Sequence, residues 1–136
     1  MTIESGSGWD SFAVDDAGGV QRELDAHITQ ANMATTKGIQ DITTLSLSAR
    51  ATLQLLADQQ DTFTTLFDDA TNVSFDVLKT VGSTSVPRTF TRSHSGQILA
   101  TEMNISNVTW GRTQSAELTA QVTAVLQDGT LPTWTT

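Results

Sequence analysis

The chain has 136 residues, a formal net charge of −8 and no cysteine. Its seven Lys and Arg residues are scattered, which argues against tight nucleic-acid binding because such binding requires clustered cations. The lack of cysteine excludes disulfides, thiolate metal sites and cysteine nucleophiles. The first eight residues are polar and no apolar run is long enough to span a membrane. We therefore expect a protein that stays in the cytoplasm or leaves it at cell lysis.

The N-terminal region is predicted to be an arm followed by a β-hairpin. Gly6 and Gly8 alternate with serines, so we expect residues 1–9 to form a flexible arm and residues 10–136 to form one β domain. The hairpin pairs residues 10–14 with residues 20–24 across a turn that contains two aspartates and two glycines.

The next two strands, residues 28–33 and 39–45, are predicted to flank an exposed loop. The residues of this loop are small and polar: Ala34, Thr35, Thr36, Lys37 and Gly38. Residues 46–58 are ambiguous, because their leucines fit either an amphipathic helix or an extended segment that ends in a turn at residues 58–60. We favour a short helical turn followed by a strand from Leu53.

One α-helix is predicted at about residues 70–81, after a strand at residues 62–67. Asp68 and Asp69 stand where a helix N-terminus needs acceptors for its free backbone N–H groups. Val77 belongs to an apolar stripe that would pack against the sheet, and Gly82 is expected to end the helix.

The C-terminal part is predicted to be β. Strands are expected at residues 89–93 and 97–110, joined by a turn at Ser95 and Gly96. The second strand changes its apolar face, which requires a bulge near Ser106 and Asn107. Residues 115–126 alternate apolar and polar side chains, as in a long half-buried strand. The sequence thus predicts a mainly β fold, an antiparallel β-sandwich or barrel with one flanking α-helix.

The sequence contains no recognisable catalytic, cofactor or metal site. His27 and His94 have no ligand-like spacing to another metal-binding residue, and the two Asp-Asp pairs fit a turn and a helix cap. Trp9, Trp110 and Trp134 are more typical of core or interface anchors than of ligand platforms. We therefore expect a protein that is not an enzyme and needs no cofactor or metal.

Eight short segments occur in a recognisable order: residues 41–50, 56–58, 65–70, 75–80, 96–99, 108–112, 117–119 and 126–134. The first reads DITTLSLSAR and the last reads LQDGTLPTW. Together they resemble the tail tube, or major tail, proteins of long-tailed bacteriophages, with Ser46 where that family usually has glycine. The resemblance extends roughly from Phe12 to Trp134.

The resemblance implies a structural virion protein, assembled in the host cytoplasm, with the tail-tube type of β fold. Such proteins form hexameric rings that stack into a hollow tube around a tape-measure protein, between tail-tip proteins and a tail terminator. Genomic double-stranded DNA passes through the lumen without specific binding, and no membrane is involved. By the same resemblance, the loop of Ala34, Thr35, Thr36, Lys37 and Gly38 is predicted to contact the neighbouring ring, together with Trp9.

The acidic charge fits such a tube, because a negative lumen would repel DNA phosphates. Two alternatives stay open. One is the tube protein of a secretion or contractile injection system, which has the same fold and ring. The other is a non-enzymatic adhesion module that binds glycans through exposed tryptophans.

Overall fold

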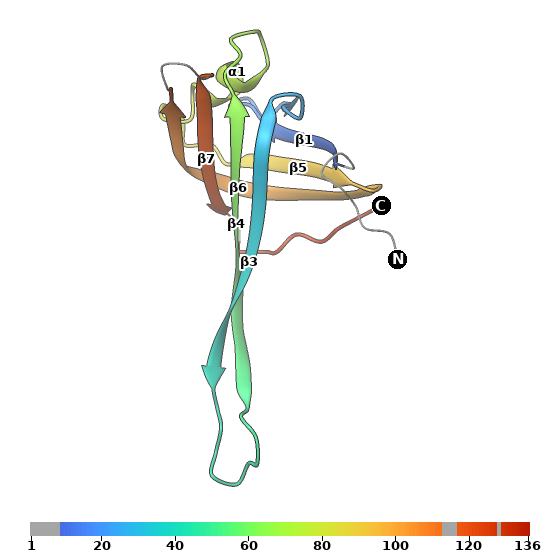
Figure 1. The fold of residues 1–136 in the computed structure, drawn as a ribbon, viewed down its shortest axis with the longest axis vertical. Coiled ribbons are helices and arrows are strands. Elements are labelled where there is room, and N and C mark those ends of the chain that lie inside the picture. Colours follow the sequence, from blue (N-terminus) through green and yellow to red (C-terminus); the bar gives the residue numbers. More distant parts are fainter. Residues whose placement is uncertain (1–8, 113–116, 128) are drawn as a thin grey trace.

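The computed structural model describes residues 9–112, 117–127 and 129–136. Within these residues the chain is mainly β, with seven strands in one antiparallel sheet and one short helix (Figure 1). The elements in chain order are β1 (Trp9–Asp15), β2 (Gln21–Glu23), β3 (Ile28–Asp41), β4 (Thr52–Leu66), α1 (Ser74–Leu78), β5 (Arg88–His94), β6 (Gln97–Gly111) and β7 (Thr119–Leu126). The predicted mainly β, antiparallel fold with one flanking helix is confirmed.

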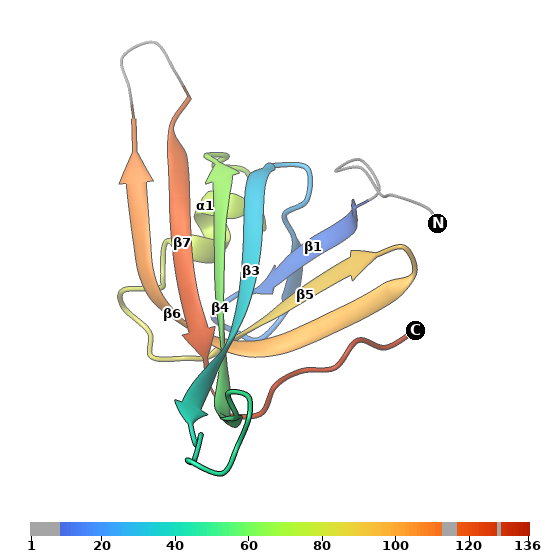
Figure 2. The same ribbon diagram turned by 60° about the horizontal axis from the view of Figure 1, so that its bottom comes forward.

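The strand order in the sheet is β2-β1-β5-β6-β7-β4-β3, and β6 belongs to both halves of it. The first part of β6, up to Met103, pairs with β5, and the part from Met103 onward pairs with β7. The register shifts between Ile105 and Asn107, so the predicted bulge is confirmed. Figure 2 shows β6 bending from one half of the sheet into the other.

The core lies between the two halves of the sheet. Phe12 of β1, Phe63 of β4 and Phe90 of β5 meet there, with ring centroids 5.1 to 6.0 Å apart. Val77 and Leu78 of α1 are buried in the same cluster, so the helix covers the core as predicted. Three strands far apart in sequence are thus held together by one aromatic contact.

The prediction of a loop at residues 34–38 is wrong. The residues Ala34 to Gly38 lie inside the continuous strand β3, and the expected turn at residues 58–60 lies inside β4. The two strands form one long hairpin whose loop spans residues 42–51. In place of a helical turn near residue 46, the loop has a bend in which the Leu47 N–H donates to the Thr44 carbonyl at 3.1 Å. The strand expected from Leu53 begins one residue earlier.

The helix is shorter than predicted and is not capped by aspartate. It begins at Ser74 after Val73, which makes no side-chain cap, and Asn72 has a φ of 67°. Asp68 instead accepts a hydrogen bond from the Ala70 N–H at 2.9 Å. The Ser74 hydroxyl donates to the carbonyl of Leu66 at 2.7 Å, which ties the helix start to the end of β4. Residues 70–73 are therefore held in a non-helical turn.

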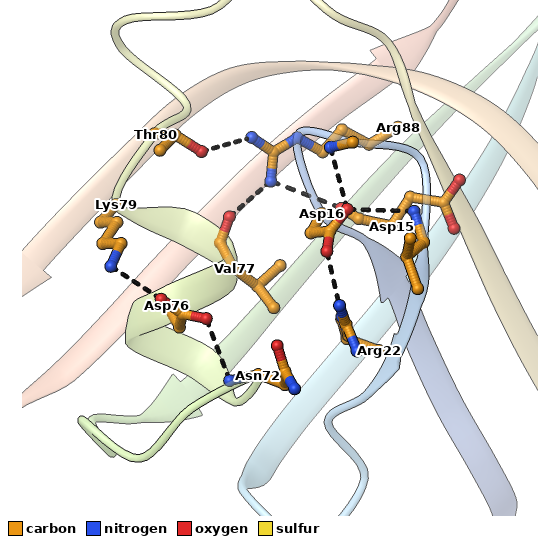
Figure 3. Close-up of polar contacts among 11 residues, drawn as sticks. Asp15, Asp16, Arg22, Asn72, Asp76, Val77, Lys79, Thr80 and Arg88 are labelled. Atoms are coloured by element: carbon orange, nitrogen blue, oxygen red, sulfur yellow. Dashed lines mark hydrogen bonds and ion pairs between the residues drawn. The ribbon is translucent and has the colours of Figure 1, made fainter.

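A buried arginine, Arg88 of β5, connects the helix to the β1–β2 hairpin (Figure 3). Its guanidinium donates to the carbonyl of Val77, to the hydroxyl of Thr80 at 3.1 Å and to the carbonyl of Asp15 at 3.4 Å. Burial lowers the pKa of Arg88, and the nearby acidic side chains oppose that shift. In the same hairpin Asp16 accepts hydrogen bonds from two turn N–H groups, which confirms the turn role predicted for it, whereas Asp15 is the last residue of β1.

A second buried arginine joins the two halves of the sheet. Arg92 of β5 contacts Asp61 of β4 with 2.6 Å between Nη2 and Oδ2, and its guanidinium lies 5.3 Å from the Phe12 ring centroid. Gln59 donates to the other carboxylate oxygen at 3.2 Å. Burial raises the pKa of Asp61, although Arg92 and Gln59 act in the opposite direction. The buried charge of Asp61 therefore depends on Arg92 for its stabilisation.

Replacing Val77 with Asp should unfold the protein, because an unpaired carboxylate would enter a site that is 1% exposed. We expect a loss of several kcal/mol in the free energy of unfolding, measured by urea denaturation. The control is Val86→Asp, at a position that is 45% exposed, which should change stability little. A folded Val77→Asp variant would show that the helix stripe is misassigned.

Replacing Arg92 with Leu should cost about 3–5 kcal/mol, because it leaves the buried Asp61 without its counter-charge. The loss should shrink as pH falls, since protonation of Asp61 removes the unpaired charge. Adding Asp61→Leu should restore part of the stability. The control is Arg50→Leu, which breaks the exposed pair with Asp41 and should change stability far less than Arg92→Leu does. Equal losses for the two arginines would contradict the expectation.

Candidate assembly surfaces

The most exposed apolar surface in the described residues is the distal part of the β3–β4 hairpin. This segment, residues 37–57, is called the arm here; it projects from the body of the protein (Figure 1). Large hydrophobic side chains that are exposed occur at twelve described positions, and seven of them are in the arm. They are Ile39, Ile42, Leu45, Leu47, Leu53, Leu55 and Leu56. An apolar surface of this kind is typical of a protein–protein contact.

The arm is apolar on both of its faces. Ile39 pairs with Gln54, and Gln40 pairs with Leu53. Because paired residues share a face and successive residues alternate, Ile39 and Leu53 point to opposite sides. Leu45 is fully exposed at the loop, and Leu56 is 93% exposed. A partner that covered only one face would leave the other in water, so we expect the arm to be enclosed between protein surfaces.

Apart from residues 52–59 of β4, which belong to the arm and pair only with β3, two long strand edges lack a strand partner within the described residues. One is the outer edge of β3, which ends the sheet and is 14 residues long. The other is the edge of β6 over residues 104–111, which β5 leaves after the pair Arg88–Met103. A recess of about 450 Å³ lies beside this edge, lined by side chains that include Val81, Ile105 and Trp110. Such edges pair readily with another strand unless they are covered.

An aromatic cluster supports the end of β6. Trp110 lies 6.0 Å from Phe67 and 5.8 Å from Phe75 between ring centroids, and Phe67 lies 4.9 Å from Phe75. Trp110 is nevertheless 39% exposed. It therefore anchors the strand end against the helix region and still presents part of its ring at the recess.

The residues predicted to contact a neighbouring ring lie on two strands, β3 and β1. Ala34 to Gly38 form an exposed stretch of β3 that leads into the arm, whereas Trp9 is the first residue of β1 and pairs with His94. Residues 1–8 of the predicted N-terminal arm lie outside the described residues. Sequence reasoning missed the arm leucines, although the apolar residues between 39 and 56 were visible as a signal. The inter-ring role of these residues stays a prediction.

Five pairs of basic and acidic side chains are in contact in the described residues. His27 contacts Asp68 at 2.7 Å between Nε2 and Oδ2, which joins the start of β3 to the segment after β4. The pKa of Asp68 is lowered mainly by the hydrogen bond from the Ala70 N–H and, to a smaller extent, by the hydrogen bond with His27. In the described part of the chain, no group of three or more His, Cys, Asp or Glu residues could hold a metal ion. The helix of five residues is too short to cross a membrane.

Comparison with known proteins shows the fold. No protein-family model and no curated protein sequence matches the chain. A chain in the virion of a native gene transfer agent particle is similar in structure, with a TM-score of 0.76, 11% sequence identity, and 98% of this chain and 100% of that chain covered. A chain in the tail of an empty gene transfer agent particle, solved with C6 symmetry, has a TM-score of 0.78, 15% identity and the same coverage. The protein thus shares its fold with these two chains over nearly its whole length.

Replacing Leu45 and Leu56 together with Ser should abolish self-association without unfolding the protein. Both side chains are almost fully exposed, so the free energy of unfolding should change by less than about 1 kcal/mol. Sedimentation velocity over a range of concentrations should show assemblies for the wild type and monomers for the double variant. The control is Val20→Ser, which is also exposed but lies outside the arm. Equal assembly of the double variant and the wild type would contradict a role for the arm.

Proposed function

We propose that this protein is the tail tube protein of a phage-like particle. It polymerises as hexameric rings that stack into a hollow tube, and genomic DNA passes through this tube to the host cell. The proposal is supported by the fold shared with a chain of a gene transfer agent tail that has C6 symmetry. It is also supported by surfaces that a monomer would leave exposed.

The observation that carries the proposal is the pair of unpartnered edges on one four-stranded half of the sheet. This half runs from residues 104–111 of β6 through β7 and β4 to β3, so its two free edges lie on opposite sides. If β3 of one subunit pairs with β6 of the next, the four-stranded half continues around a ring and each of these two edges gains a partner strand where they overlap. Six subunits would close it.

The resulting barrel is wide enough for a channel. Six sets of four strands give 24 strands. At a spacing of about 4.8 Å, the closed sheet has a backbone diameter of at least about 37 Å, and strand tilt increases it. Barrels of 16–18 strands already enclose aqueous channels. A ring of this kind therefore encloses a lumen rather than a packed core.

The arm is the part that connects successive rings. Its two apolar faces would be covered if it lay between subunits of the next ring, and Ala34 to Gly38 lead into it. The proposed inter-ring contact therefore extends from residues 34–38, where the sequence placed it, to the arm leucines. Trp9 is kept in this proposal as a contact at the start of β1.

The further partners follow from the tail-tube role. The tube would form around a tape-measure protein, between tail-tip proteins and a tail terminator, in the host cytoplasm, and would end in the virion tail. The protein would carry out no reaction and need no cofactor, and it would not enter a membrane. A secretion or contractile injection tube would use the same ring, and no observation favours it over a phage-like tail.

Negative-stain electron microscopy of the purified protein should show rings or hollow tubes with sixfold symmetry as the concentration is raised. The arm leucines and the free edges of β3 and β6 drive this assembly. The control is the Leu45→Ser/Leu56→Ser variant, which should give single subunits. Compact monomers or trimers of the wild type, even with tail-tip proteins present, would contradict the proposal and favour the adhesion module.

A further inference from the structure

The four-stranded half of the sheet has one face that no other element of the described residues covers. Along β4 and β7 the buried side chains, such as Phe63 and Val122, alternate with partly exposed ones on the other side. The helix and the strands β1 and β5 pack on the buried side. The uncovered side of residues 30–36, 58–66, 104–109 and 119–125 is called the polar face here.

The centre of the polar face consists of hydroxyl and amide side chains. The cross-strand pairs there are Thr62 with Thr123 and Thr64 with Gln121. The pairs on the β3 side are Asn32 with Thr62 and Gln30 with Thr64, and Asn104 and Thr109 occupy the β6 side. Val125, Ala34 and, at the end of β4, Leu66 are apolar exceptions.

One charged side chain belongs to the polar face as described, and it is Asp58. It pairs with Thr36 at the edge of the face, where the arm begins. The nearest cation along the chain, Lys37, pairs with Ala57 and therefore points to the opposite side of the hairpin. Arg112 follows the end of β6, beyond the paired residues of the face. A protein with a net charge of −8 thus keeps this face almost neutral.

Ring closure decides where the polar face points. When the edges of β3 and β6 join in a ring, one face of the sheet must turn toward the axis. The other face is already covered by the subunit's own core elements. The polar face is therefore the one available to line the lumen.

We infer that the polar face lines the lumen and lets a polyanion pass because it is neutral and carries no cation, not because it repels the polyanion. This inference rests on the proposed function and specifies the chemistry of the same surface. Nonspecific affinity for DNA comes mainly from cations that displace counterions, and the polar face offers none. Hydroxyl and amide groups exchange hydrogen bonds with water at little net gain, so they hold phosphate weakly.

Repulsion contributes little in this arrangement. One Asp58 per subunit gives six carboxylates per ring, whereas six whole chains at −8 carry −48. At physiological ionic strength charges are screened over about 8 Å, so this single ring acts on DNA only near the wall. Neutrality of the wall, rather than its negative charge, is then the property that permits sliding.

The test uses tubes assembled from the purified protein and a short fluorescent DNA duplex. Tubes are incubated with the duplex at 50 mM salt, treated with nuclease, sedimented, and assayed for protected DNA. Wild-type tubes should protect almost none. Thr62→Lys tubes should protect at least about tenfold more, and this excess should vanish at 200 mM salt. Gln121→Lys, at an exposed position of the same face, provides a second variant if the first assembles poorly.

Two control variants separate the possible causes. Thr91→Lys places the same charge at a half-buried threonine on the outer side of β5, so its tubes should bind DNA that nuclease can digest. Asp58→Asn removes the carboxylate without adding a cation, and it should protect DNA no more than twofold above wild type.

The outcomes separate the inference from the proposed function. If wild-type protein forms no tubes, the proposed function fails, and the inference fails with it. If tubes form but both lumen-facing Lys variants behave like Thr91→Lys, the polar face does not line the lumen. If Asp58→Asn protects as much DNA as Thr62→Lys, repulsion by the carboxylate ring controls passage and neutrality does not.

Discussion

The structure depends on one strand that serves two halves of a sheet. β6 pairs with β5 up to Met103 and with β7 beyond it, and the bulge between Ile105 and Asn107 absorbs the change of direction. Because β5 leaves at this point, the sheet folds over its own core and Phe12, Phe63 and Phe90 meet. The same departure leaves residues 104–111 without a second neighbour. The contact that builds the subunit therefore also creates the edge at which another subunit can join.

The angle between the two halves is held by buried arginines. Arg92 joins β5 to β4 through Asp61, and Arg88 joins β5 to the helix and to the β1–β2 hairpin. Burying such charges is costly, so they are weak evidence for stability, but each has few alternative partners. A ring closes only if every subunit presents its edges at the same angle. Directional contacts of this kind suit that requirement, because a charge-assisted hydrogen bond adds geometric specificity as well as energy.

The half-buried strands could be predicted from the sequence, but the hairpin arm that projects from the rest of the subunit could not. Alternation in residues 119–126 and the turn at Ser95 and Gly96 were visible because the core demands one apolar face and the turn demands positive φ. Neither face of the arm is buried in the subunit, so its sequence shows no alternation of apolar and polar residues. The small polar residues that lead into it therefore resembled a loop. The aspartate cap failed because Ser74 bonds to the end of β4 and holds the preceding residues in a turn. The unpaired strand edges could not be predicted from the sequence, because they depend on the residue at which a neighbouring strand stops pairing.

The surface of the protein is divided by chemistry, and the division fits assembly into a tube. Ion pairs lie at the β1–β2 turn, between Asp16 and Arg22, and at the helix, between Asp76 and Lys79. They are on the covered side of the four-stranded half, which would face outward from a ring. Apolar side chains are concentrated in the arm, where only subunits of the same tube would meet them. The face left between these two regions is neutral, and it is the one that a ring would turn inward. A soluble monomer needs no such separation, because scattered charge would serve it equally well. The separation becomes useful when the three surfaces meet different surroundings, namely solvent, subunits and a passing polyanion.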